Sequence, residues 1–406
     1  MFAEKAVIKA TFHDALVVHV DLSAVAWFLA ITLLFGALLM QSKSPRLPYA
    51  RGASALCFAS GCLCIALAPI LGNGTPIMSN YVPVYTSPLF FLGLGLIYAS
   101  LVLGVINTLL DLPSLHITPS HYGILGAMYI LLLALLHFAW SYTRLDTITP
   151  GTQDYYEVLF WAGGHILQLA YTQLLLVAWL WLAFAAKLRH IPGHIFLIVL
   201  FSIYPLVATL SPIAFLNGSE PYDLHFFTLQ MRHGGGIAAI ILGLYVFCAL
   251  LRSGLPSTET RAVWLSLVVS LLVFTVGGTF GHAITDSNTI IPAHYHGSIV
   301  GTTQAFMCVI YLLLPKLGYG NILHRKLTLA QPLLYGGGSI LHATGLAIAG
   351  GHGVARKTVG ALDESQMAAE AALQVMRLGG ALAILGGALF VALVVISVRR
   401  KGQVRA

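Results

Sequence analysis

The sequence predicts an all-α polytopic membrane protein with about eleven transmembrane helices in one bundle, and three observations support this fold class. Of the 406 residues, 58% are hydrophobic and 9% are charged, whereas a soluble domain carries about 25% charged residues. The apolar residues form long continuous runs, unlike the alternating segments of about ten residues that build a membrane β-barrel. The basic residues collect in the short loops between these runs, which accounts for the net charge of +7 without a nucleic-acid partner.

Eleven apolar segments follow one another, each close to the length of about 20 residues that a bilayer requires. They cover residues 15–40, 50–71, 86–110, 121–142, 155–186, 194–216, 231–252, 262–284, 292–315, 329–351 and 374–398. The fifth is long enough to tilt or to extend beyond the bilayer. No internal repeat or long linker divides the chain. We therefore expect one transmembrane helical domain over residues 1–406, surrounded by membrane lipid.

The loops that follow alternate segments carry most of the basic residues, and this asymmetry predicts the orientation. Cytoplasmic loops of membrane proteins are enriched in lysine and arginine, so these loops are expected to face the cytoplasm. The N-terminus is then outside and the C-terminus inside, in the inner membrane of a bacterium. Arg356 and Lys357 form a basic pair on the outer side and therefore need a local partner. The cytoplasmic set is Lys43, Arg46, Arg51, Lys187, Arg189, Arg252, Arg261, Lys316, Arg325, Lys326, Arg399, Arg400 and Lys401.

Sixteen histidines in a chain with few charges are the main functional signal, because a polar ring inside a membrane requires a partner or a metal. His294 and His296 open the ninth segment from the outer side. On a helix they lie about 200° apart, so they point to nearly opposite faces and suit two separate metal centres. His19 lies at similar depth in the first segment. Two imidazoles at matched depth on separate helices can hold one haem iron from both sides.

Two further histidines lie in contexts that suggest a site. His165 is deep in the fifth segment, and the preceding Gly163 and Gly164 leave room for something bulky beside its ring. His225 is expected in the loop before the seventh segment. The five cysteines all fall inside apolar segments, so a disulfide framework is not expected.

The histidine pattern resembles subunit I of the haem–copper oxidases, a family that includes the nitric oxide reductases. In that family the tenth helix carries Ala-His-aromatic-His, which residues 293–296 match. The resemblance implies that His294 binds a high-spin haem and that His296 and His19 bind a low-spin haem. It covers essentially the whole chain, with the first helix of the family missing.

The resemblance also implies one copper ion, but the match is incomplete. His165 corresponds to the copper ligand on the sixth helix of the family. The two adjacent copper histidines before its eighth helix correspond to Leu224 and His225, so one ligand is absent. A third ligand would come from His233 or from solvent. Copper held by His165 and His225, or copper chemistry that has been lost, both remain open.

The outer-side basic pair has a counterpart in the same family. Its penultimate helix reads His-x-x-Gly-Leu-Ala, followed by two basic residues that hold haem propionates. Residues 342–347 match this pattern, and Arg356 and Lys357 follow after a longer gap. Asp286 lies where the family places propionate or metal contacts. The resemblance thus implies that haem carboxylates are the partners of the basic pair.

The implied activity is that of a terminal oxidase-like respiratory oxidoreductase, which reduces dioxygen at a high-spin haem–copper centre fed by a low-spin haem. In this reading His165 and His225 face the open side of the iron, and Tyr204 supplies a proton and an electron. Nitric oxide reduction is the alternative, since it needs no tyrosine. A third possible function is that of a non-catalytic haem protein for electron transfer, sensing or assembly. Leu224 favours it, because it stands where the family has a copper ligand. Electron entry would belong to other oxidase subunits, because the chain has no CxxxC motif.

Overall fold

The protein is described here by a computed structural model that covers residues 12–39, 47, 49–111, 117–216, 224–322, 325–356 and 367–400. In this part of the chain eleven helices are long and apolar enough to cross a membrane, which confirms the predicted fold class. The chain forms two compact units. The first takes in the chain up to Leu174 and residues His194–Ala238, and the second takes in Leu175–Gly193 and the chain from Ala239 onward. That the whole chain forms one domain stays a prediction.

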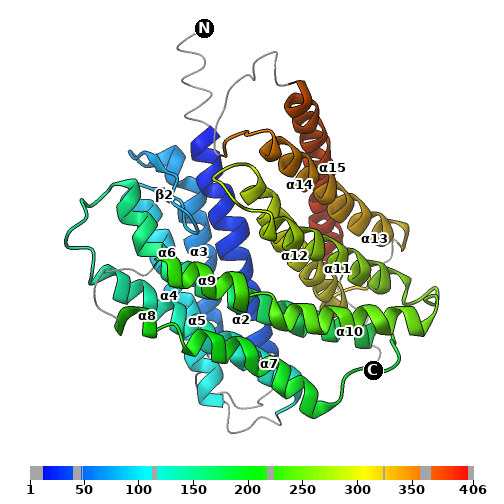
Figure 1. The fold of residues 1–406 in the computed structure, drawn as a ribbon. Coiled ribbons are helices and arrows are strands. Elements are labelled where there is room, and N and C mark those ends of the chain that lie inside the picture. Colours follow the sequence, from blue (N-terminus) through cyan, green and yellow to red (C-terminus); the bar gives the residue numbers. More distant parts are fainter. Residues whose placement is uncertain are drawn as a thin grey trace. The chain divides into compact units, whose positions relative to one another are not determined.

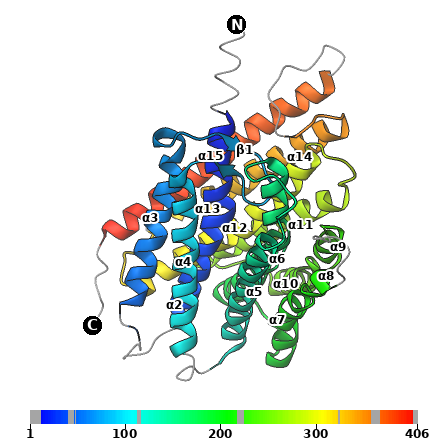
Figure 2. The same cartoon turned by 90° about the vertical axis from the view of Figure 1, so that its left-hand side faces the viewer.

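The first unit begins with a helix whose middle is wound more widely than an α-helix. Residues 12–20 are helical, η1 (Asp21–Ala26) is a π-helical turn, and α2 (Trp27–Leu39) completes the span. The remaining long helices are α3 (Ala50–Leu71), α4 (Pro88–Asp111), α5 (Pro119–Tyr142), the first part of α6 (Gln153–Ala185), and α7 (His194–Thr209). Helices α3 and α4 lie side by side, as do α5 and α7 (Figures 1 and 2).

A short antiparallel hairpin joins α3 to α4, and apolar patterning does not predict it. Strand β1 (Pro76–Ile77) pairs with β2 (Val84–Tyr85). The Thr75 N–H donates to the Thr86 hydroxyl at 2.8 Å, which closes the base of the hairpin. The hairpin matters for function because its turn carries Tyr81 to α6.

The seventh predicted segment starts earlier than expected. Helix α9 (Leu224–Gly234) is followed by α10 (Ile237–Ser253), and the short α8 (Ile213–Leu216) precedes them. His225, predicted in a loop, therefore lies in the first turn of a helix. The helix extends this far because Phe227 is buried and because the Leu224 carbonyl accepts hydrogen bonds from the Thr228 hydroxyl and the Trp161 indole N–H.

The second unit contains the end of α6, α10, and two pairs of neighbouring helices. Helix α11 (Arg261–His282) packs along α12 (Ile290–Lys316). The next span consists of α13 (Arg325–Pro332), the π-helical turn η3 (Leu333–Gly337) and α14 (Gly338–Gly351), and it packs along α15 (Met367–Arg399). Figure 1 shows α14 and α15 as neighbours in orange and red. Helix α12 also contacts α14, so it has a neighbour on each of two faces.

Candidate functional site

His165 lies at the centre of the candidate site in the first unit, on the buried side of α6. Its side chain is 4% exposed. The ring nitrogen Nδ1 lies 2.8 Å from the Trp161 carbonyl oxygen, and Nε2 lies 2.8 Å from the Tyr81 hydroxyl. A carbonyl oxygen only accepts hydrogen bonds, so Nδ1 carries the proton. In the neutral ring Nε2 is then an acceptor, to which Tyr81 donates.

The glycines before His165 make room for bulky neighbours, as the sequence predicted. A Cβ atom at Gly164 would lie 2.3 Å from Cγ of Tyr81, and one at Gly163 would lie 2.3 Å from Cε1 of Phe138. The neighbours are therefore two aromatic side chains of the chain itself. Tyr81 was not predicted as a site residue, because the hairpin that delivers it has no periodic signal in the sequence.

His225 does not face His165 in this arrangement. Phe227, two residues further along α9, is the residue whose ring approaches His165, with 6.5 Å between the ring centroids. Residues two apart on a helix point about 200° apart, so His225 points away, and its side chain is exposed. Within the described residues no cluster of three or more His, Cys, Asp or Glu side chains could hold a metal ion. The residues present therefore do not fit the copper ion that the sequence led us to consider.

A second buried imidazole, not predicted from the sequence, lies near this site. His137 of α5 is 1% exposed, and its Nδ1 lies 2.7 Å from the Leu133 carbonyl oxygen. Its ring approaches Phe227, with centroids 5.8 Å apart. His137 has no motif around it, so burial is the only signal that distinguishes it.

Tyr204, the predicted catalytic tyrosine, is fully buried in α7. Its hydroxyl donates a hydrogen bond of 2.9 Å to the carbonyl oxygen of Gly235, where the chain passes from α9 to α10. The side chain therefore ties α7 to this break between helices. A catalytic role for Tyr204 stays a prediction.

His19 lies in the helical segment before η1, and its side chain is exposed. It belongs to the first unit, whereas His296 belongs to the second, so their joint ligation of one haem also stays a prediction. Asp21, two residues further on, is fully buried, and neither oxygen of its side chain has a hydrogen-bond partner within the described residues.

His294 in the second unit faces α11, where three glycines allow the two helices to approach closely. A Cβ atom at Gly277 would lie 2.2 Å from the Ser298 nitrogen, and one at Gly297 would lie 2.3 Å from the Gly277 Cα. This crossing brings the Gly277 carbonyl oxygen to 2.8 Å from Nδ1 of His294. A Cβ at Gly281 would lie 2.7 Å from the same ring, so this glycine leaves the space that the imidazole occupies.

His296 faces the opposite side of α12, which confirms the predicted divergence of the two rings. Its Nδ1 lies 2.8 Å from the Pro292 carbonyl oxygen, and its ring lies against that of His342 on α14, with centroids 4.6 Å apart. Nδ1 of His342 in turn lies 3.0 Å from the Met376 carbonyl oxygen. His342 belongs to the His-x-x-Gly-Leu-Ala motif, and the sequence did not predict this contact.

These hydrogen bonds fit the requirements of a haem ligand. A histidine that binds a metal through one nitrogen usually donates a hydrogen bond from the other, which fixes the ring. In His294 and His296 the nitrogen Nδ1 faces a carbonyl, so Nε2 carries the lone pair. The residues of α12 thus suit two haem irons, one on each side of the helix.

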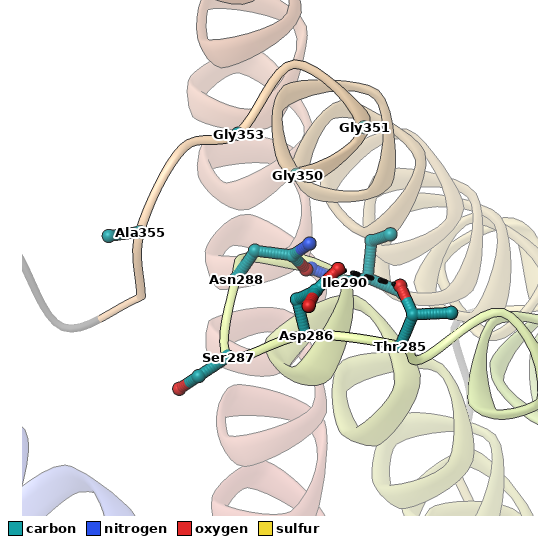
Figure 3. Close-up of a pocket in the computed structure, with 9 residues that line it drawn as sticks. All are labelled: Thr285, Asp286, Ser287, Asn288, Ile290, Gly350, Gly351, Gly353 and Ala355. Carbon is teal, nitrogen blue, oxygen red and sulfur yellow. Dashed lines mark hydrogen bonds between the residues drawn. The ribbon is translucent and has the colours of Figure 1, made fainter.

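The predicted outer-side residues Asp286 and Arg356 lie in the loops that cap α11, α12 and α14. Asn288 forms an isolated β-bridge with Ala355, and Nε of Arg356 donates to the Ser287 hydroxyl at 3.1 Å. Beside this contact lies an open pocket of about 410 Å³ (Figure 3). Asp286 is exposed there, and its side chain accepts a hydrogen bond of 2.9 Å from the Thr285 hydroxyl. Lys357 lies outside the described residues.

Comparisons with known proteins agree with the fold. The family model of the cytochrome c and quinol oxidase polypeptide I matches residues 1–383. An uncharacterized protein of Rickettsia prowazekii (strain Madrid E) is 29% identical, over 94% of this chain and 86% of its own length. An uncharacterized protein of Aquifex aeolicus (strain VF5) is 28% identical, over 76% of each.

Among solved structures, a heme-copper terminal oxidase dimer determined by cryo-EM is similar to this chain. The TM-score is 0.76, with 15% sequence identity, and the match covers 96% of this chain and 77% of the solved one. At this identity the similarity is one of fold.

Proposed function

Because the chain belongs to the cytochrome c and quinol oxidase polypeptide I family, we propose that it is a haem-binding respiratory oxidoreductase subunit that reduces dioxygen. The single observation that carries the proposal is the arrangement on α12, where His294 and His296 face opposite sides and each has Nδ1 against a backbone carbonyl. We place the protein in a bacterial inner membrane. Its partners would be other oxidase subunits, from which electrons enter.

His294 would hold the haem at which dioxygen reacts, and His296 with His19 would hold the low-spin haem that feeds it. Haem iron supplies the one-electron and oxygen chemistry that side chains lack. The protein supplies fixed ring orientations through the Gly277 and Pro292 carbonyls. Its apolar spans exclude water and so help to set the haem potentials. No step involves copper in this proposal, since His165 and His225 do not fit a copper site.

The outer-side pocket is where we propose that haem carboxylates approach the chain. Arg356 supplies a guanidinium that can form paired hydrogen bonds with a carboxylate, and Asp286 and Lys357 complete the predicted set. Arg356→Gln should lower haem occupancy or shift a haem potential. Arg377→Gln, which removes a solvent-exposed partner of Glu370, is the control and should do neither.

The proposed function is tested by haem analysis of the purified protein together with single histidine variants. Two haems are expected in the native chain. His296→Ala should abolish the low-spin signal and retain the high-spin one, and His294→Ala should do the reverse. Oxygen consumption by membranes of the His294→Ala variant should fall to the background of a strain that lacks the chain. A native protein without haem would exclude the proposal.

A second candidate function is favoured by the hydrogen bond between Tyr81 and His165. A chain in which the Tyr81 hydroxyl already occupies the predicted copper ligand His165 would carry electrons through its haems without reducing a gas. Native protein with intact haem signals but no oxygen or nitric oxide consumption would support this candidate.

A further inference from the structure

We propose that Tyr81 takes the place of a metal ion at His165, so that this chain keeps His165 as a hydrogen-bonded structural pair and binds no copper there. The pair lies wholly within the first unit. The inference therefore does not depend on whether haem is bound by the second unit, and the two proposals can fail separately.

Both nitrogens of His165 already have a partner. Nδ1 faces the Trp161 carbonyl at 2.8 Å, and Nε2 faces the Tyr81 hydroxyl at 2.8 Å. Metals bind the lone pair of a neutral imidazole. With Nδ1 protonated, the only such lone pair is on Nε2, and the Tyr81 hydroxyl donates to it. A metal at His165 must displace this hydroxyl from a ring that is 4% exposed.

Several independent contacts hold Tyr81 in this position. Its backbone adopts a φ of +63°, in the left-handed region that residues other than glycine seldom occupy. Its ring packs edge-on against Trp161, with centroids 5.8 Å apart, and fills the space beside Gly164. A backbone conformation of this kind persists only where the surrounding contacts require it.

The neighbouring residue of the hairpin turn is also attached to α6. The Asn80 backbone N–H donates to a Glu157 carboxylate oxygen at 2.8 Å, and the Asn80 side-chain amide donates to the other oxygen. Glu157 lies two turns before His165 on the same helix, and residues eight apart share a helix face. The turn is thus fixed to α6 at two points, and the hydroxyl of Tyr81 has little freedom to leave Nε2.

The residues that would complete a copper site do not face His165. Phe227 of α9 turns its ring toward His165, which directs His225 to the other side of that helix. Leu224 lies three residues before Phe227 and hence close to the same face as Phe227. Its replacement by histidine would bring a second imidazole toward His165, which makes Leu224→His the informative variant.

The test measures cuprous-ion affinity, with a chromophoric chelator as competitor, for four forms of the full-length protein. These are the native chain, Leu224→His, Tyr81→Phe and the double variant, each also made with His165→Ala to identify binding that requires His165. Tyr122→Phe is the matched control, because it removes a hydroxyl that contacts Ser202 at 3.1 Å on a different helix pair of the same unit.

We expect no His165-dependent copper binding in the native chain or in Tyr122→Phe, and only weak binding in Leu224→His. The double variant should bind copper through His165 up to about tenfold more tightly than Leu224→His, as the loss of one competing hydrogen bond implies. Gly164→Ala with Leu224→His should act similarly, because the added Cβ pushes the Tyr81 ring away. This variant keeps the proposal testable if Tyr81→Phe fails to fold.

Two results would overturn the inference. Native protein that retains one copper lost on His165→Ala would show that Tyr81 does not exclude the metal. The second is equal copper affinity in Leu224→His alone and in its combinations with Tyr81→Phe and Gly164→Ala. That result, or no binding in any of the three, would show that the Tyr81 hydroxyl is not what prevents copper binding. Haem content, measured on the same samples, tests the proposed function separately.

Discussion

At the scale of single residues, the partner of each ring nitrogen decides what each histidine can do. His165, His294 and His296 all direct Nδ1 to a backbone carbonyl, and in His165 the Tyr81 hydroxyl also lies against Nε2. The sequence predicted these three histidines as candidate site residues. It did not predict the difference between them, because the Tyr81 hydroxyl comes from a residue 84 positions earlier in the chain.

His342 should tune the haem that His296 binds without itself being needed for haem retention. His342→Ala removes the ring that lies 4.6 Å from the His296 ring and so loosens the orientation of the ligand. We expect a shifted midpoint potential and an altered electron paramagnetic resonance spectrum of the low-spin haem, with its content preserved. Leu341→Ala, at an exposed neighbouring position, is the control. An unchanged potential in His342→Ala would contradict the expectation.

Tyr204→Phe should lower stability, because it leaves the buried carbonyl of Gly235 without this hydrogen bond. A buried acceptor that loses its partner costs about 1–3 kcal/mol. We expect thermal unfolding in detergent to begin at a lower temperature, with haem spectra unchanged below the transition. Turnover that disappears at full stability would instead support the catalytic role predicted from the sequence.

At the scale of elements, close helix contact and local winding position the site residues. The glycines of α11 and α12 let a backbone carbonyl reach His294. The spans themselves could be predicted, because lipid requires continuous apolar helices of a certain length. The hairpin, the early start of α9 and the π-helical turns could not, since each depends on contacts with distant segments rather than on local periodicity.

Gly277→Ala should separate α11 from α12, whereas Gly278→Ala should have little effect. A Cβ at Gly277 meets the backbone of α12 at 2.2 Å, but one at Gly278 meets nothing within 4 Å. Overpacking of this kind costs about 1–3 kcal/mol. Haem content and thermal stability of the two variants should therefore differ, with the high-spin haem lost first from Gly277→Ala. Equal behaviour of the two would show that the crossing does not support His294.

At the scale of the whole molecule, the eleven spans within the described residues confirm the fold class, and the family match agrees with it. The orientation remains a prediction from the basic loops. It could be made from sequence because charge asymmetry acts during insertion and is independent of packing. Joint binding of one haem by His19 and His296 could be suggested only from their similar depth in the membrane. The sequence does not give the distance between the two residues.

Thiol labelling tests the orientation on intact cells. Ser287→Cys lies in the loop between α11 and α12, and Ser257→Cys lies between α10 and α11, and both side chains are exposed. The natural cysteines all lie in spanning helices. A membrane-impermeant maleimide should label Ser287→Cys from outside and reach Ser257→Cys only after lysis. The reverse pattern would place the N-terminus in the cytoplasm.

The number of residues in the π-helical turns η1 and η3 determines the direction in which two histidine side chains point. Each inserts roughly one residue more per turn than an α-helix does, which is a rotation of about 100°. His19 lies just before η1 and His342 just after η3. Suppose that one of residues 21–26 were deleted and the turn became a regular α-helix. Phe28 and Phe35 could then remain buried only if His19 rotated about the helix axis by that angle. These turns should therefore tolerate exchanges of residue type but not a change in length, and alignments that shift a gap across them will misplace both rings.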